Sequence, residues 1–122
     1  MRLNEITYDN AVPVDGYGPG FFRVGGRAME GHVLVTPAGA VVWAGLDDPD
    51  PILAQSDALD VLLLGMGADI ALPPDAFTGA LEAAGIGVEV MSSPSAARAY
   101  NILLSEGRRV GVALLTVDAP PA

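Results

Sequence analysis

The turn Gly65-Met66-Gly67, which ends a strongly apolar run, is the first group of residues whose types and spacing could support chemistry. Exposed glycine amides near a helix start bind anions, so the turn is a candidate anion-binding site at the carboxyl edge of a parallel sheet. It lacks the third glycine of a dinucleotide loop and the lysine of a nucleotide-triphosphate loop. Asp69 would also oppose a phosphate. A purely structural tight turn is therefore favoured, and a small-molecule cleft here is the alternative.

The remaining acid, base and nucleophile candidates form no recognisable catalytic set. The one histidine, His32, starts a predicted strand, and no Gly-x-Ser-x-Gly elbow is present. Asp47, Asp48 and Asp50 lack the spacing of a calcium loop, which favours a solvated acidic loop. The chain has no cysteine, which excludes disulfides, thiolate nucleophiles and zinc-thiolate sites. We therefore predict no catalytic residues, no metal site and no cofactor.

A group of aromatic and helix-borne polar residues is the candidate partner surface. Arg98 and Asn101 are neighbours at i and i+3 of a predicted helix, and Tyr100 beside them is amphipathic. Tyr17 and Phe22 flank a glycine-rich loop, where exposed aromatic rings would suit a protein interface. The favoured alternative for the helix is structural, with the tyrosine hydroxyl and the asparagine amide satisfying loop backbone at the edge of the core.

The elements that must position these residues predict an α/β fold. Apolar and β-branched runs predict strands, helical periodicity with prolines in the first turn predicts two main helices, and an acidic, proline-broken loop lies between the two halves. The expected strands are residues 6–8, 21–24, 32–36, 40–44, 60–64, 88–91 and 110–117, and the expected helices begin near residues 73 and 94 and end near residues 84 and 106.

Strand order in the chain predicts a mixed sheet. The first half is expected to form an antiparallel β-meander, with residues 15–20 as a structured loop between strands. The second half reads β-α-β-α-β, which implies two right-handed crossovers and parallel strands. The run Val61-Leu62-Leu63-Leu64 has no polar alternation and is predicted to be the central strand, buried on both faces.

Composition limits the classes of protein to consider. A chain of 122 residues that is 51% hydrophobic predicts a single domain, residues 1–122, with an ordered core at about 6–117 and a frayed tail at 118–122. A net charge of -9 disfavours nucleic acid as a partner. No apolar stretch reaches the ~20 residues that span a bilayer, and the first residues do not resemble a signal peptide. We expect a soluble, cytoplasmic protein that is not membrane-embedded.

Several stretches together resemble a known family. They are residues 17–21, 31–35, Trp43, 62–67, 85–91 and 97–110. The chain resembles the small single-domain family of the mitochondrial NADH:ubiquinone oxidoreductase complex assembly factor 3 and its uncharacterised bacterial and archaeal relatives, from about residue 6 to residue 117. The resemblance implies an α/β domain with a mixed sheet and no known cofactor or catalytic residues. For the mitochondrial member it implies a scaffold role, through respiratory complex subunits or other assembly factors. The Arg-only, Ala- and Gly-rich composition looks bacterial.

Three functions are therefore compared. The preferred hypothesis is a non-enzymatic interaction protein that resembles an assembly factor and assists assembly of the respiratory complex. The second is a small-molecule or anion binder, or an unrecognised enzyme, that uses the turn at residues 65–69. The third is a structural subunit of a homo-oligomer.

Overall fold

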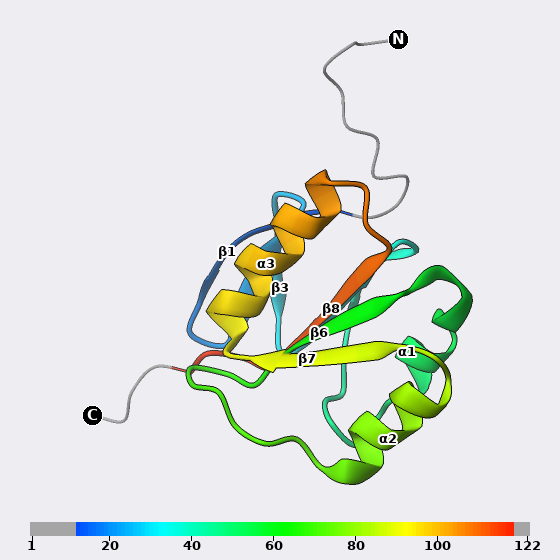
Figure 1. The fold of residues 1–122 in the computed structure, drawn as a ribbon. Helices are drawn as coiled ribbons and strands as arrows, with labels where there is room; N and C mark the ends of the chain where they lie inside the picture. The colour runs from blue at the N-terminus through cyan, green and yellow to red at the C-terminus, as the bar shows by residue number, and fades with distance from the viewer. Residues whose placement is uncertain (1–11, 119–122) are drawn as a thin grey trace, which may run out of the picture.

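The computed structural model describes residues 12–118, so the predicted strand at 6–8 and most of the predicted tail at 118–122 lie outside the described residues. Within them the chain forms an α/β domain (Figure 1). The strands are β1 (Val14–Gly18), β2 (Phe21–Val24), β3 (Arg27–Glu30), β4 (Val33–Thr36), β5 (Gly39–Val42), β6 (Val61–Gly65), β7 (Gly87–Met91) and β8 (Val110–Leu114). The helices are α1 (Asp50–Leu53), the 3-10 turn η1 (Ser56–Ala58), α2 (Asp75–Ala83) and α3 (Ser93–Ser105).

Two sheets share these strands. The first is antiparallel with the order β1-β2-β3, and the second is mixed with the order β5-β4-β8-β6-β7. β6 is parallel to both β7 and β8, whereas β4 is antiparallel to β8. This arrangement confirms the predicted α/β fold with a mixed sheet. The predicted meander is divided, because the β4–β5 hairpin joins the second sheet.

The strand order shows that the prediction of residues 61–64 as the central strand is wrong. β8, not β6, is the middle strand of the five, and all five of its residues are buried. β6 lies between β8 and β7, and Leu62, Leu63 and Leu64 are buried as expected. Both strands are uninterrupted apolar runs, so the run alone does not tell which one lies in the middle. The α3 connection decides, because it carries the chain from β7 past β6 to the far side of that strand.

The two main helices belong to opposite faces of the five-stranded sheet. Successive side chains of a strand point to opposite faces. Leu62 and Leu64 pack with Phe77 and Leu81 of α2, whereas Leu63 packs in a separate cluster with α3. A parallel crossover has a fixed hand, and β6 to β7 runs in the opposite direction across the sheet from β7 to β8, so the two helices fall on different faces. We call these the α2 face and the α3 face.

The α3 face is covered by two elements together. α3 contributes Ala96, Tyr100 and Leu104 to its core cluster, and the three-stranded sheet contributes Val14 and Phe22. Figure 1 shows β1 beside α3, and these two elements are in contact. The sequence explains the clean start of α3, since Ser92 is the N-cap, its side chain accepts from the Ser95 N–H at 3.3 Å, and Pro94 stands in the first turn.

The prediction for the glycine-rich segment at residues 15–20 is also wrong for most of its length. It was expected to be a loop, but Val14–Gly18 is strand β1, and the turn to β2 is confined to Pro19 and Gly20. Asp15 sits at a register irregularity between Val14 and Gly16. Gly20 has φ 75°, which supplies the left-handed residue that the turn needs. None of the helices in residues 12–118 has the length and apolar character of a membrane-spanning helix.

Candidate functional site

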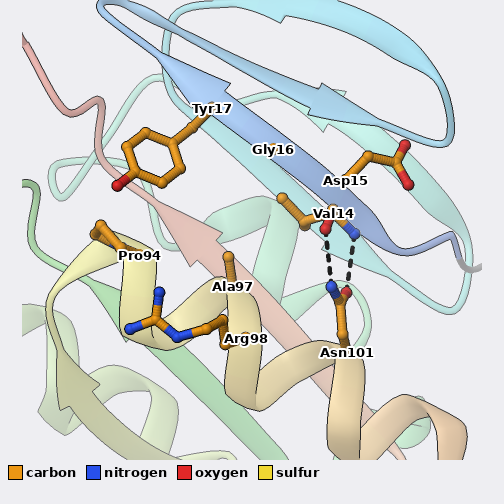
Figure 2. Close-up of a pocket in the computed structure, with 8 residues that line it drawn as sticks. All are labelled: Val14, Asp15, Gly16, Tyr17, Pro94, Ala97, Arg98 and Asn101. Atoms are coloured by element: carbon orange, nitrogen blue, oxygen red, sulfur yellow. Dashed lines mark hydrogen bonds between the residues drawn. The ribbon is translucent and has the colours of Figure 1, made fainter.

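Two adjacent residues of α3 fasten that helix to the start of the first sheet. Figure 2 shows Asn101 facing Val14, whose N–H donates to Asn101 Oδ1 at 2.9 Å while Asn101 Nδ2 donates to the Val14 carbonyl at 2.8 Å. The Tyr100 hydroxyl donates to the Val12 carbonyl at 2.8 Å. Asn101 thus pairs with Val14 as a neighbouring strand would, which satisfies both backbone groups at the outer edge of β1. We call Tyr100 and Asn101 the latch.

The helix geometry explains why Tyr100 and Asn101, although adjacent, make their hydrogen bonds in different surroundings. Neighbours on a helix are about 100° apart, so they face different surroundings. Tyr100 points into the core of the α3 face and is fully buried, whereas Asn101 is half-buried at the strand edge. The expected structural role of the tyrosine hydroxyl and asparagine amide is therefore confirmed by the hydrogen bonds to Val12 and Val14.

An open groove of about 250 Å³ runs between β1 and α3 beside the latch (Figure 2). We call it the β1–α3 groove. Its lining residues are Val14, Asp15, Gly16, Tyr17, Pro94, Ala97, Arg98 and Asn101. Of the lining residues, Gly16 has no side chain and Ala97 contributes a single methyl group. The groove therefore arises from the sequence of both walls.

Tyr17 and Arg98 give the groove its exposed chemical groups. Tyr17 is directly opposite Phe22 in the β1–β2 ladder, so both side chains lie on the sheet face that packs toward α3. Phe22, in the middle strand, is covered, whereas Tyr17, at the edge, is 47% exposed. Figure 2 shows the Tyr17 ring pointing toward Pro94, and the Arg98 guanidinium lies at the same end of the groove.

The two charged side chains of the groove, Asp15 and Arg98, differ in their hydrogen bonds. Asp15 accepts from the Gly26 N–H at 2.5 Å, so its carboxylate also serves the β2–β3 turn. Arg98 Nη2 lies 3.5 Å from Ser95 Oγ, a long contact for a hydrogen bond, and the arginine is exposed. The guanidinium therefore retains most of its donors for a group that approaches from solvent.

The structure corrects two of the five residues in the predicted partner surface. Phe22 and Tyr100 are 0% exposed and belong to the core of the α3 face. Neither can contact a partner without unfolding the domain. Tyr17, Arg98 and Asn101 do come together, because all three line the β1–α3 groove. Solvent exposure determines which of the five residues can contact a partner, and the sequence alone does not reveal that exposure.

The turn at residues 65–67 is packed by Ser93. The Gly67 N–H donates to Ser93 Oγ at 2.9 Å, Ser93 Oγ donates to the Leu115 carbonyl at 2.6 Å, and the Met66 N–H donates to the Met91 carbonyl at 2.9 Å. A Cβ on Gly65 would lie 2.6 Å from Ser93 Cα, so the glycine is required by close packing. The amides of Met66 and Gly67 are thus already used and are not available to an anion.

Two further side chains have structural contacts that the sequence did not reveal. His32 Nδ1 accepts from the Thr116 N–H at 3.0 Å, which fastens the chain after β8. The role of Ser93 was also missed, because the Ser92-Ser93-Pro94 pattern indicates only a helix cap. Within residues 12–118, no cluster of three or more His, Cys, Asp or Glu side chains is arranged to hold a metal ion.

Comparison with known proteins places the chain in a family. The family model described as "Protein of unknown function (DUF498/DUF598)" matches residues 14–115. The chain belongs to this family. An uncharacterised protein of Rhodobacter capsulatus is 50% identical over 115 residues, which cover 94% of this chain and 93% of that protein.

The resemblance to the assembly factor is confirmed as a distant one. NADH dehydrogenase [ubiquinone] 1 alpha subcomplex assembly factor 3 of Mus musculus is 27% identical over 123 residues. The match covers 94% of this chain but 66% of the mouse protein. The two proteins therefore share a homologous domain, and the mouse protein has additional sequence.

Solved structures support the fold. A Bartonella henselae protein, described as an outer membrane protein, superposes with a TM-score of 0.82 at 30% identity and covers 90% of this chain and 98% of that one. A Mth938-like domain of Bordetella pertussis gives a TM-score of 0.74 at 29% identity, with coverage of 98% and 94%. These two proteins thus share the fold of this chain.

Proposed function

We propose that this protein is a non-enzymatic interaction protein that assists assembly of a respiratory NADH:ubiquinone oxidoreductase from the cytoplasmic side of the membrane. The observation that carries the proposal is the β1–α3 groove, where exposed Tyr17 and Arg98 flank an unfilled apolar floor. The distant homology to assembly factor 3 supports the identity of the complex. The partners are respiratory complex subunits or other assembly factors.

The chemistry of the groove suits a protein side chain. Tyrosine and arginine are, with tryptophan, the residue types enriched at binding hot spots, where truncation to alanine costs about 2 kcal/mol or more. The groove of about 250 Å³ has room for an apolar side chain, and the Arg98 donors favour a carboxylate beside it. The matching partner segment therefore presents an apolar residue next to an Asp or Glu.

The latch makes the groove a preformed surface. Asn101 fixes β1 at Val14, at the end of the groove away from Pro94 (Figure 2). A wall that is already ordered loses less conformational entropy when a partner binds. Binding at this groove thus needs no rearrangement of the domain.

Affinity purification from cells of the source organism tests the proposal. Three tagged baits are compared with an untagged control by quantitative mass spectrometry: the wild type, the double variant Tyr17→Ser/Arg98→Ala, and the matched control Arg108→Ala, an exposed arginine outside the groove. We expect the wild type and Arg108→Ala to enrich subunits or assembly factors of the respiratory complex, and the groove variant to lose them.

Two results would contradict the proposal. If the wild type enriches only its own chain, the homo-oligomer hypothesis is favoured, and light scattering would then show a multimer. If the groove variant retains the respiratory proteins at the wild-type level, the groove is not the binding surface. A thermal melt of each bait checks that the variants are folded.

A further inference from the structure

The loop between β6 and α2 exposes large apolar side chains. All residues from 68 to 72 are exposed, with Leu72 at 95% and Ile70 at 67% of their full accessible surface. A scattered exposed leucine is ordinary, but two large apolar side chains within three residues of one loop form a continuous apolar tip. We call Ile70, Ala71 and Leu72 the apolar loop.

The apolar loop is held in place at both ends. On one side, Gly67 is bonded to Ser93 through both its N–H and its carbonyl. On the other side, Pro73 and Pro74 restrict the backbone, and the residue before a proline is confined to extended conformations. α2 then starts at Asp75. Leu72 is therefore presented to solvent by a restrained backbone, which lowers the entropy lost on binding.

The charged residues in the sequence segment that contains the apolar loop are all acidic. From residue 33 to residue 97 the sequence contains no Lys or Arg, and its acidic residues are Asp47, Asp48, Asp50, Asp57, Asp60, Asp69, Asp75, Glu82 and Glu89. This segment contains the strands β4 to β7, α1, η1, α2 and the first turn of α3. Asp69 and Asp75 flank the apolar loop directly and are exposed. An apolar tip with an acidic rim thus projects from the β6–α2 connection.

We infer that the apolar loop docks into an apolar pocket of a partner protein that is rimmed by Lys and Arg side chains. Charge complementarity selects this occupant, because a basic rim would face Asp69 and Asp75. A second copy of this chain would bring the two acidic rims together, and an anionic lipid surface or a nucleic acid would repel them. This surface is additional to the β1–α3 groove, whose free charge is a guanidinium, so the protein would bridge two partners of opposite charge.

Site-specific photocrosslinking in source cells tests the inference on the full chain. The bait carries Leu72→p-benzoylphenylalanine, and the matched control carries Ile102→p-benzoylphenylalanine, at a residue of α3 that is 59% exposed. After irradiation, the crosslinked peptide is identified by mass spectrometry. We expect position 72 to crosslink to a protein at an apolar site with Lys or Arg in its rim, at a yield well above that of position 102.

Charge variants of the same bait sharpen the result. Asp69→Asn/Asp75→Asn is expected to reduce the yield roughly threefold, the loss of two exposed charge contacts, and salt should reduce the wild-type yield in the same direction. Glu30→Gln/Glu106→Gln, two exposed acids outside the 33–97 segment, should leave the yield unchanged. Crosslinking to a second copy, to lipid or to a pocket without basic residues overturns the inference, and so does a yield no higher than that of position 102.

Failure here is distinguishable from failure of the proposed function. Tyr17→Ser/Arg98→Ala should leave the position 72 crosslink intact, because the two surfaces involve different residues. Loss of the crosslink in that variant would show that the apolar loop has no independent partner, and this overturns the inference while leaving the groove proposal in place.

Discussion

The α2 face and the α3 face of the five-stranded sheet are covered in different ways. On the α3 face a helix and a second sheet share the cover, and hydrogen bonds from the latch join them. On the α2 face, Ile52 of α1 and Phe77 of α2 belong to one apolar cluster. Phe77 also packs against Trp43, which follows β5, with ring centroids 5.9 Å apart and an interplanar angle of 50°. Hydrogen bonds fix the relative position of the elements that they join, whereas apolar packing tolerates more variation in that position.

The charged residues are also unevenly distributed along the sequence. The segment that supplies α1 and α2 contains only acids, whereas the arginines of the described chain, at positions 23, 27, 98, 108 and 109, lie before or after it in the sequence. The structure gives one ion pair of these arginines, Arg109 to Asp60 at 3.2 Å, with both side chains more than half exposed. Such an exposed pair contributes little stability, about 0 to 1 kcal/mol. This ion pair therefore contributes little to folding.

A substitution in β6, whose side chains pack on both faces of the sheet, should cause the largest loss of stability. Leu63→Asp puts an unpaired carboxylate into β6, where Leu63 is 1% exposed, and the cost of several kcal/mol is comparable with a total stability of ~5 to 15 kcal/mol. We expect loss of the folded state, measured by circular dichroism and by the dispersion of NMR signals. A cooperative melt near the wild-type temperature would show that β6 is not a core strand.

The α2 face should lose about 3 to 5 kcal/mol when its aromatic pair is broken. Phe77→Ala removes a ring that is 2% exposed and leaves a cavity beside Trp43. Urea denaturation measures the loss, and the fluorescence of the only tryptophan reports the local change. A change below about 1 kcal/mol would mean that α2 packs loosely on the sheet.

The α3 face should lose about 2 to 3 kcal/mol when the latch is cut. Asn101→Ala leaves the N–H and carbonyl of Val14 without their side-chain partner, and each unpaired group costs about 1 kcal/mol or more. Hydrogen exchange at Val14 should accelerate more than exchange in β6. Uniform acceleration across both sheets would contradict a local role for the latch.

The exposed wall of the groove should give the smallest effect on stability. Arg98→Ala is expected to change the free energy of unfolding by less than about 0.5 kcal/mol, because the side chain is exposed and has one long hydrogen bond. Thermal denaturation against the wild type measures it. Destabilisation comparable with that of Asn101→Ala would assign Arg98 to the structure rather than to recognition.

The fold class could be predicted because its signals are local. Apolar runs at 61–64 and 110–114 and the serine-proline start of α3 were each sufficient to identify an element. Strand order has no such local signal, because it depends on the side of β6 to which the chain returns after α3. β1 and β3 were missed because glycines at 16, 18, 25 and 26 mask short strands that are stabilised by their neighbours.

The candidate site was predicted in part for a related reason. The residue types of Tyr17, Arg98 and Asn101 indicated recognition, and the fold brings these three together. Phe22 and Tyr100 have similar chemistry, but a middle strand and an inward helix position bury them. Residue type shows what a side chain can do, whereas tertiary packing decides whether solvent reaches it.

The most direct test of the central claim is an NMR titration of the isotope-labelled protein with the purified partner that affinity purification identifies. A chain of 122 residues is small enough for residue-by-residue assignment. We predict amide shift changes concentrated at residues 14–17 and 95–101, on the two walls of the β1–α3 groove, and their disappearance in Tyr17→Ser/Arg98→Ala. Binding without shifts at either wall would contradict the account.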